Sequence, residues 1–208
     1  VDGPILGNGD MGVVIAGPAE AQRFWLAKNS FWRLKDGHRQ GGPRGFGGLE
    51  INIPDLAGAS YRIEQDIYSA ITTSTFTNNE SVVTMRSLVP ATSSLLLVEL
   101  SVSGKPVEVG TRLWVERGRG SRESMSRKGT LLWASKKFTT SVKLPTSAAG
   151  ALTMLGGSPR YPKLEPLSEG DEDLVPDWPE GKLGGRPTDL PPAKSQPGST
   201  FTLQPGEK

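Results

Sequence analysis

The sequence predicts an all-β protein, an antiparallel two-sheet β-sandwich of the super-sandwich type with one proline-rich irregular insertion. Segments that alternate apolar and polar residues recur along the chain, as in LEINIP at 49–54. The 26 glycines and 17 prolines gather in residues 37–48 and 156–198, whereas the remainder is rich in Val, Ile, Thr and Leu. This composition favours strands separated by turns over helices.

Composition also narrows the functional classes. The 208 residues fit one large domain, and 24 Lys and Arg against 22 Asp and Glu leave little attraction for nucleic acid or an anionic membrane. The chain has no cysteine and a single histidine, His38, so disulfides, thiolate catalysis and a histidine-rich zinc site are excluded within it. No apolar run approaches the roughly 20 residues of a membrane helix.

The first strands form a hairpin. The turn GNGDMG at 7–12 ends a leading loop over residues 1–12, and apolar runs at 12–16 and 22–28 follow it on either side of Gly17-Pro18. Glycine and asparagine in such a turn supply the left-handed backbone that it needs. In the second run, alternation places Phe24 and Leu26 on one face and Trp25 on the other.

The later strands follow at regular intervals, which is typical of a sandwich. Asn78-Asn79 marks a hairpin turn, and the most apolar segment, 94–103, is expected to be a central strand. The predicted strands after the first hairpin are 49–54, 61–67, 70–77, 80–89, 94–103, 107–115, 130–134, 137–143, 151–155 and 199–203.

Three segments are predicted to be irregular. Residues 35–48 form a solvated basic loop whose His38, Arg39 and Arg44 could line the mouth of a site. The arginine-rich run 116–128 is interpreted as a long hairpin loop, in preference to an RNA-binding segment, because no aromatic residues are interleaved. Prolines dominate the insertion at 156–198, and its acidic run at 169–173 leaves calcium as a minor alternative.

The first 33 residues carry a resemblance to a known family. Pro4, the turn at 7–12 and the segment NSFWR at 29–33 resemble the N-terminal β-sandwich domain of bacterial glycoside hydrolases with an (α/α)6-barrel catalytic domain. The most similar groups are the α-L-fucosidase-like and maltose-phosphorylase-like families. The resemblance implies a single N-terminal domain over residues 1–208, truncated before its last strands, that packs on the helical barrel.

The resemblance also implies the residues of a glycan site. Asn8 and Asp10 would brace the turn beside the substrate cleft, and Asn29, Trp32 and Arg33 would border the glycan. An aromatic ring next to amide and guanidinium groups suits sugars, because the ring stacks on apolar C–H faces while polar groups bind hydroxyls. The alternative for Trp32, which is expected just after its strand, is a core residue that anchors a loop.

Catalysis is not expected from this chain alone, although the resemblance makes its parent protein a glycoside hydrolase. Glycoside hydrolysis needs two carboxyl groups across the scissile bond. The candidates by type, Glu50, Glu64, Asp66 and Glu99, lie in predicted strands, and the resemblance places the catalytic pair in the barrel. We expect no catalytic residue, cofactor or metal here, and a periplasmic or secreted location. The alternative function is a stand-alone carbohydrate-binding or structural module.

Overall fold

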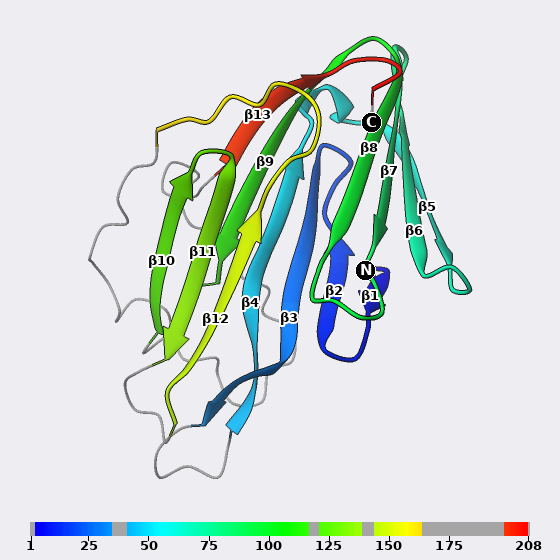
Figure 1. Ribbon diagram of the computed structural model, residues 1–208. Helices are drawn as coiled ribbons and strands as arrows, with labels where there is room; N and C mark the ends of the chain where they lie inside the picture. Colours follow the sequence, from blue (N-terminus) through cyan, green and yellow to red (C-terminus); the bar gives the residue numbers. More distant parts are fainter. Residues whose placement is uncertain (1–2, 35–40, 117–120, 139–143, 164–197, 208) are drawn as a thin grey trace.

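The computed structural model describes residues 3–34, 41–116, 121–138, 144–163 and 198–207 and is built almost entirely of antiparallel strands (Figure 1). One short 3-10 helix, η1 (Pro54–Leu56), interrupts them within the described residues. The strands are β1 (Ile5–Gly7), β2 (Met11–Ala16), β3 (Ala21–Leu34), β4 (Gly41–Asn52), β5 (Ser60–Asp66), β6 (Ile71–Thr77), β7 (Ser81–Leu88), β8 (Leu97–Gly104), β9 (Val107–Val115), β10 (Ser121–Lys128), β11 (Leu131–Phe138), β12 (Thr146–Leu152) and β13 (Gly198–Leu203).

Six of these strands form the main sheet, in the order β1-β2-β3-β4-β9-β13. The remaining strands form a four-stranded sheet, β5-β6-β7-β8, and a three-stranded sheet, β10-β11-β12. Figure 1 shows these two smaller sheets lying at opposite sides of the view, with the main sheet between and behind them. The second layer of the sandwich is therefore divided between two separate sheets.

Both smaller sheets pack on the same face of the main sheet. Leu49 and Leu113 are direct partners in β4 and β9 and so share one face. Leu49 belongs to the large core under the four-stranded sheet, where it lies with Phe76 and Val83, whereas Leu113 packs with Ala134 under the three-stranded sheet. Leu26 and Leu152 touch both clusters. The all-β sandwich predicted from the sequence is thus confirmed.

The predicted first hairpin is also confirmed, because β2 and β3 pair antiparallel from Met11–Lys28 to Ala16–Arg23. The leading loop is shorter than predicted, since β1 occupies Ile5–Gly7. Phe24 faces the core, and Trp25 lies on the outer face of the main sheet against Trp114.

Two predictions about the ends of β3 and β4 are wrong. Trp32 lies within β3, which continues to Leu34, and part of the expected glycine loop, 41–48, belongs to β4. The pairing tolerates this because it shifts register between Leu26 and Ala27 and again before Trp32, as at a β-bulge. His38 and Arg39 lie outside the described residues, and Arg44 is an exposed residue of β4.

The strand assignments after residue 116 also need correction. Part of the expected hairpin loop at 116–128 is β10, an edge strand that pairs with β11 along its whole length. The two strands predicted at 130–134 and 137–143 are one strand, Leu131–Phe138, with 139–143 outside the described residues. The next strand is Thr146–Leu152 instead of 151–155, and β8 is an edge strand instead of a central one.

The predicted last strand is confirmed as β13, which pairs antiparallel with β9. Before it, Arg160 and Thr200 exchange two backbone hydrogen bonds of 2.7 and 2.9 Å, so the start of the proline-rich insertion lies along the edge of the main sheet. The remainder of that insertion, residues 164–197 with the acidic run, lies outside the described residues.

Candidate functional site

The turn between β1 and β2 is organised by the side chain of Asn8. Its Oδ1 accepts hydrogen bonds from the backbone N–H groups of Asp10 (3.1 Å) and Met11 (2.8 Å), and Gly9 adopts the left-handed backbone at φ 86°. An asparagine that accepts from residues two and three positions on is a common way to close a tight turn. The glycine and asparagine of the motif are therefore explained by backbone geometry.

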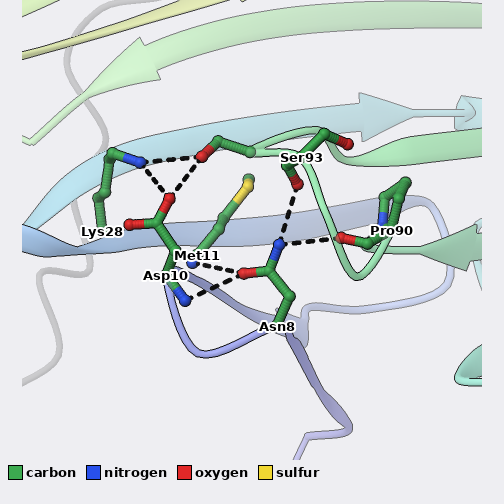
Figure 2. Close-up of polar contacts among 7 residues, drawn as sticks. Asn8, Asp10, Met11, Lys28, Pro90 and Ser93 are labelled. Atoms are coloured by element: carbon green, nitrogen blue, oxygen red, sulfur yellow. Dashed lines mark hydrogen bonds and ion pairs between the residues drawn. The ribbon is translucent and has the colours of Figure 1, made fainter.

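The same asparagine ties this turn to a distant loop. Its Nδ2 donates to the carbonyl oxygens of Pro90 (2.9 Å) and Ser93 (3.0 Å), which follow β7 in the four-stranded sheet (Figure 2). A primary amide has two N–H donors and two acceptor sites on its oxygen. All four are used within the protein, so Asn8 holds the turn in place and has no group left for a ligand.

Asp10 forms an ion pair with Lys28 beside this turn. Lys28 Nζ donates to Asp10 Oδ2 at 2.5 Å and to Ser94 Oγ at 2.8 Å, and Ser94 Oγ donates to the same carboxylate oxygen at 2.7 Å. The hydrogen bond from Lys28, followed by that from Ser94, holds the pKa of Asp10 below its ordinary value. The group is exposed, so the carboxylate and ammonium groups remain open to a ligand.

Asn29 connects this cluster to Trp32. Its backbone N–H donates to the carbonyl of Asp10 at 2.7 Å, and its own carbonyl accepts the indole Nε1–H of Trp32 at 2.5 Å. The Trp32 side chain is 40% exposed. The backbone carbonyl of Trp32 accepts a hydrogen bond from Thr146 Oγ1 at 2.6 Å, which ties this part of β3 to β12. The ring is thus presented at the surface in a fixed position.

Arg33 lies on the opposite side of β3 from Trp32, as alternation along a strand requires. Its residue is only 6% exposed, and its guanidinium carbon lies 5.3 Å from the ring centre of Phe138. That ring also stacks on Phe31 at 5.5 Å between centroids. The five residues predicted for the site therefore divide: Asn8, Asp10, Asn29 and Trp32 follow one another through hydrogen bonds, and Arg33 is buried between sheets.

A second cation shares the pocket of Arg33. Lys136 on β11 is buried, with Nζ 5.3 Å from the centre of the Phe138 ring, 3.3 Å from the Gly45 carbonyl and 3.9 Å from Glu116. Burial lowers the pKa of Lys136 below its ordinary value, and the nearby carboxylates of Glu116 and Glu123 oppose that shift. This cluster supports the packing of the three-stranded sheet on the main sheet.

Sequence reasoning missed Lys28, Ser94 and Lys136. Lys28 could have been found from its place in the hairpin, because it is the direct partner of Met11 next to the turn. Ser94 is 84 residues from Asp10, and Lys136 falls between the two strands predicted at 130–134 and 137–143. No local pattern marks either of them.

The carboxylates considered for catalysis each have a local partner. Glu50, nearly buried on the outer face of the main sheet, is held by Arg23 Nε at 2.8 Å and by Arg112 NH2 at 2.7 Å. Glu64 pairs with Arg62 at 2.7 Å. The other two are Glu99, which lies 3.6 Å from Arg86, and Asp66, which caps the turn after β5.

The part of the chain that the structure describes contains no group of three or more His, Asp or Glu residues that could hold a metal ion. The acidic run at 169–173 falls outside it. A polar hollow of about 450 Å³ lies where the insertion meets β13 and is lined by Glu108, Arg160, Thr200 and Glu207 among others. Within the described residues, no helix is long and apolar enough to cross a membrane.

The fold and its surface define an all-β sandwich with a fixed, exposed tryptophan beside an exposed ion pair. No protein-family model matches the chain, and no curated protein sequence matches it. The resemblance to glycoside hydrolase domains therefore rests on the motifs of the first 33 residues.

Proposed function

We propose that this chain is a non-catalytic β-sandwich domain of a carbohydrate-active enzyme, a glycoside hydrolase, that packs on a helical-barrel catalytic domain. In this proposal it lends the turn at 7–12 and the Trp32 segment to a glycan-binding cleft. The parent protein acts in the periplasm or outside the cell, where glycans are met. The residues that touch the glycan are Trp32, Asp10, Lys28 and Asn29.

The observation that carries the proposal is the fixed presentation of Trp32. Its Nε1–H bonds to the carbonyl of Asn29 and its own carbonyl bonds to Thr146, so the exposed ring is already ordered. An aromatic face that is ordered in advance loses little conformational freedom when it stacks on the C–H face of a sugar. This supports a sugar-binding role better than a core role.

The ion pair of Asp10 and Lys28 supplies the polar partners. Among the described residues, the hydrogen bonds to the Asp10 carboxylate from Lys28 and Ser94 both go to Oδ2, which leaves Oδ1 to accept from a hydroxyl group of a glycan. Asn29 joins the backbone of Asp10 to the indole of Trp32, which keeps the aromatic ring and the carboxylate close together. Arg33 is withdrawn from the proposed contact set because it is buried.

The test is titration of the 208-residue chain with a panel of neutral and acidic oligosaccharides, followed by tryptophan fluorescence and heat. Saturable binding that is lost in Trp32→Ala and retained in Tyr68→Ala would support the proposal. Tyr68 is a matched control because it is an exposed aromatic residue at another turn.

The Trp32→Ala variant in the full-length protein, with Leu155→Ala at another openly exposed site as its control, covers a cleft that only the catalytic domain completes. There we expect Trp32→Ala to raise KM or lower kcat for the glycan while unfolding is unchanged. Absence of binding by the folded chain together with unchanged kinetics of Trp32→Ala would exclude the glycan role. That result would favour the alternative, a structural module.

A further inference from the structure

Asp10, Lys28 and Ser94 form a closed triangle of hydrogen bonds beside the turn at 7–12. Lys28 Nζ donates to Asp10 Oδ2 and to Ser94 Oγ, and Ser94 Oγ donates to the same carboxylate oxygen. Figure 2 shows the charged ends of Asp10 and Lys28 pointing toward one another. Ser94 comes from the loop before β8, in the four-stranded sheet, so the triangle joins the two layers of the sandwich.

This arrangement orders the two charged groups before any ligand binds. A surface ion pair usually contributes little to stability, because two long side chains lose freedom when it forms. Here the hydroxyl group of Ser94 bonds to both partners, at 2.7 Å from Asp10 and 2.8 Å from Lys28, and limits the movement of each. Groups that are already ordered bind a ligand at a smaller cost in conformational entropy.

The triangle leaves one donor and one acceptor next to each other. A lysine ammonium has three N–H groups, and Asp10 and Ser94 take two of those of Lys28. Oδ1 of Asp10 accepts no hydrogen bond within the described part of the chain. The exposed fractions of the Lys28 and Asp10 side chains are 40% and 51%. A ligand can therefore reach the third N–H of Lys28 and Oδ1 of Asp10 together.

A neutral ligand that donates and accepts side by side matches this pair. Two hydroxyl groups on adjacent carbon atoms, a vicinal diol, can donate to Asp10 through one oxygen and accept from Lys28 through the other. Hydrogen bonds to ionised partners are stronger than those between neutral groups. A carboxylate or sulfate ligand would be repelled by the open oxygen of Asp10, and an ammonium ligand would be repelled by Lys28. The pair has no net charge that would offset either repulsion.

The fixed ring of Trp32 is linked to this pair through hydrogen bonds. Asn29 follows Lys28 in β3, donates its backbone N–H to the Asp10 carbonyl and accepts from the Trp32 indole. A pyranose ring has an apolar C–H face, which suits the indole ring, and hydroxyl groups at its edge, which suit the ion pair. The two features together favour a neutral sugar over a simple polyol.

We propose that Asp10 and Lys28 together bind a vicinal diol of a neutral sugar, with one hydroxyl group donating to Asp10 Oδ1 and the adjacent hydroxyl group accepting from Lys28 Nζ. Ser94 is a positioning residue, because it holds Oδ2 of Asp10 and one N–H of Lys28 without contacting the sugar. The inference rests on the proposed function for a sugar at this site. It adds the class of that sugar, which is uncharged and has free hydroxyl groups on adjacent carbons.

Deoxy sugars test the proposal without any change in the protein. The probes are methyl β-glucopyranoside and methyl β-galactopyranoside, titrated into the 208-residue chain and followed by NMR and tryptophan fluorescence. The 3-deoxy derivatives contain no vicinal diol and should bind about tenfold more weakly. The 6-deoxy derivatives also lose one hydroxyl group but keep the diols, so they should bind almost as well as the parent sugars. Equal affinities of the 3-deoxy and 6-deoxy sugars would overturn the proposal, and so would tighter binding of methyl β-glucuronide.

Variants of the triangle locate the diol on the protein. Asp10→Asn and Lys28→Met should each weaken binding of the glucoside about tenfold. The matched control is Glu80→Gln, in the exposed ion pair of Glu80 with Lys105, which should leave binding unchanged. Ser94→Ala should weaken binding and raise the pH at which binding is lost in acid, because the hydrogen bond from Ser94 lowers the pKa of Asp10. Ser94→Thr, which keeps the hydroxyl group, should restore both.

The outcomes separate this proposal from the proposed function. Sugar binding that requires Trp32 but survives both Asp10→Asn and removal of the 3-hydroxyl group would keep the glycan role and overturn the diol. Absence of binding by every probe to the folded chain would also overturn the diol, whereas the glycan role would then be decided by the kinetics of Trp32→Ala in the full-length protein.

Discussion

The indole rings of Trp25 and Trp114 meet edge to face over the outer surface of the main sheet, with centroids 4.6 Å apart and planes at 82°. They belong to β3 and β9, which are not neighbours, because β4 runs between them. The residue of β4 between them is Gly48, the direct partner of both. Only the absence of a side chain at Gly48 lets the two rings touch.

Gly48→Ala is therefore expected to destabilise the protein. The added Cβ would lie 2.9 Å from Trp114 Cζ2 and 2.1 Å from the carbonyl oxygen of Phe24, which is fixed backbone. Overpacking of this kind costs about 1–3 kcal/mol, and we expect the upper end. Urea unfolding gives the measurement. Gly12→Ala is the control, because nothing lies within 4 Å of its Cβ, and equal midpoints for the two variants would contradict this account.

Asn8→Ala is expected to destabilise the protein by about 2 kcal/mol, because it removes four hydrogen bonds. A hydrogen bond contributes about 0.5–1.5 kcal/mol, and these four are partly exposed, so each is taken at the lower end of that range. Asn8→Asp separates the contributions: it keeps the oxygen that closes the turn and loses the donors to Pro90 and Ser93. Hydrogen exchange at Met11 should then quicken in Asn8→Ala, which loses the acceptor of its N–H, and less in Asn8→Asp, which keeps it. An Asn8→Asp protein with the stability of the parent would show that the cross-sheet bonds contribute nothing.

Asp10 is expected to titrate below an ordinary aspartate, because hydrogen bonds from Lys28 and Ser94 favour its ionised form. Since its pKa is lower in the folded state, the stabilisation by this pair is present above about pH 3.9 and is lost as pH falls through the folded pKa. Carboxyl chemical shifts measured by NMR give the value. Lys28→Met should raise the pKa of Asp10 more than Ser94→Ala does, and the opposite order would refute the assignment.

Lys136 leads to a second pH prediction, in which burial instead of hydrogen bonding lowers the pKa. Burial lowers the pKa of Lys136 in the folded protein, so the unfolded chain binds its proton more tightly. Stability should consequently rise with pH between that lowered pKa and about 10.4, the pKa of a free lysine. Lys136→Met replaces the buried ammonium group near Phe138 with an unbranched apolar side chain and should match or exceed the parent in stability at pH 7.

Urea unfolding of the parent and the Lys136→Met variant across the alkaline range checks this. The control is Lys137→Met, an exposed lysine on the other side of β11. A large loss of stability in Lys136→Met alone would mean that the ion pair with Glu116 outweighs the cost of burial.

The sequence predicts strands best where one face is buried. Alternation identifies β9 over its whole length and the hairpin of β2 and β3. In each of these strands the residues on the core face, such as Val13, Phe24 and Val109, are buried, whereas many of their neighbours in sequence are not. β10 escapes this reasoning: as an edge strand it buries only Ser121 fully and keeps charged residues such as Arg122 in water. Its strand conformation depends on pairing with β11, and the residues of β10 alone give no pattern from which that pairing could be predicted.

Glycine misleads the prediction of β4 for a related reason. Gly45, Gly47 and Gly48 resemble a flexible loop, yet each lies in a strand where a Cβ would meet other atoms at less than 3 Å. The neighbours responsible include Trp114 and Glu116, which are more than 60 residues away along the chain, and Phe24 on the adjacent strand. Of the candidate site, Asn8, Asp10 and Trp32 were found through a motif, whereas Ser94 and the burial of Arg33 depend on how sheets pack.

Because the second layer of the sandwich consists of two separate sheets, we expect that the molecule does not unfold as a single unit. The three-stranded sheet is held to the main sheet by a cluster of four buried residues, Phe46, Leu113, Val115 and Ala134, and by the charged pocket around Phe138, whereas the four-stranded sheet covers a far larger core. Sub-global opening follows such differences in buried contact. Amides of β10, β11 and β12 should exchange with solvent at a lower free energy than those of β6 and β7, so a single melting temperature would describe only the larger part of this protein.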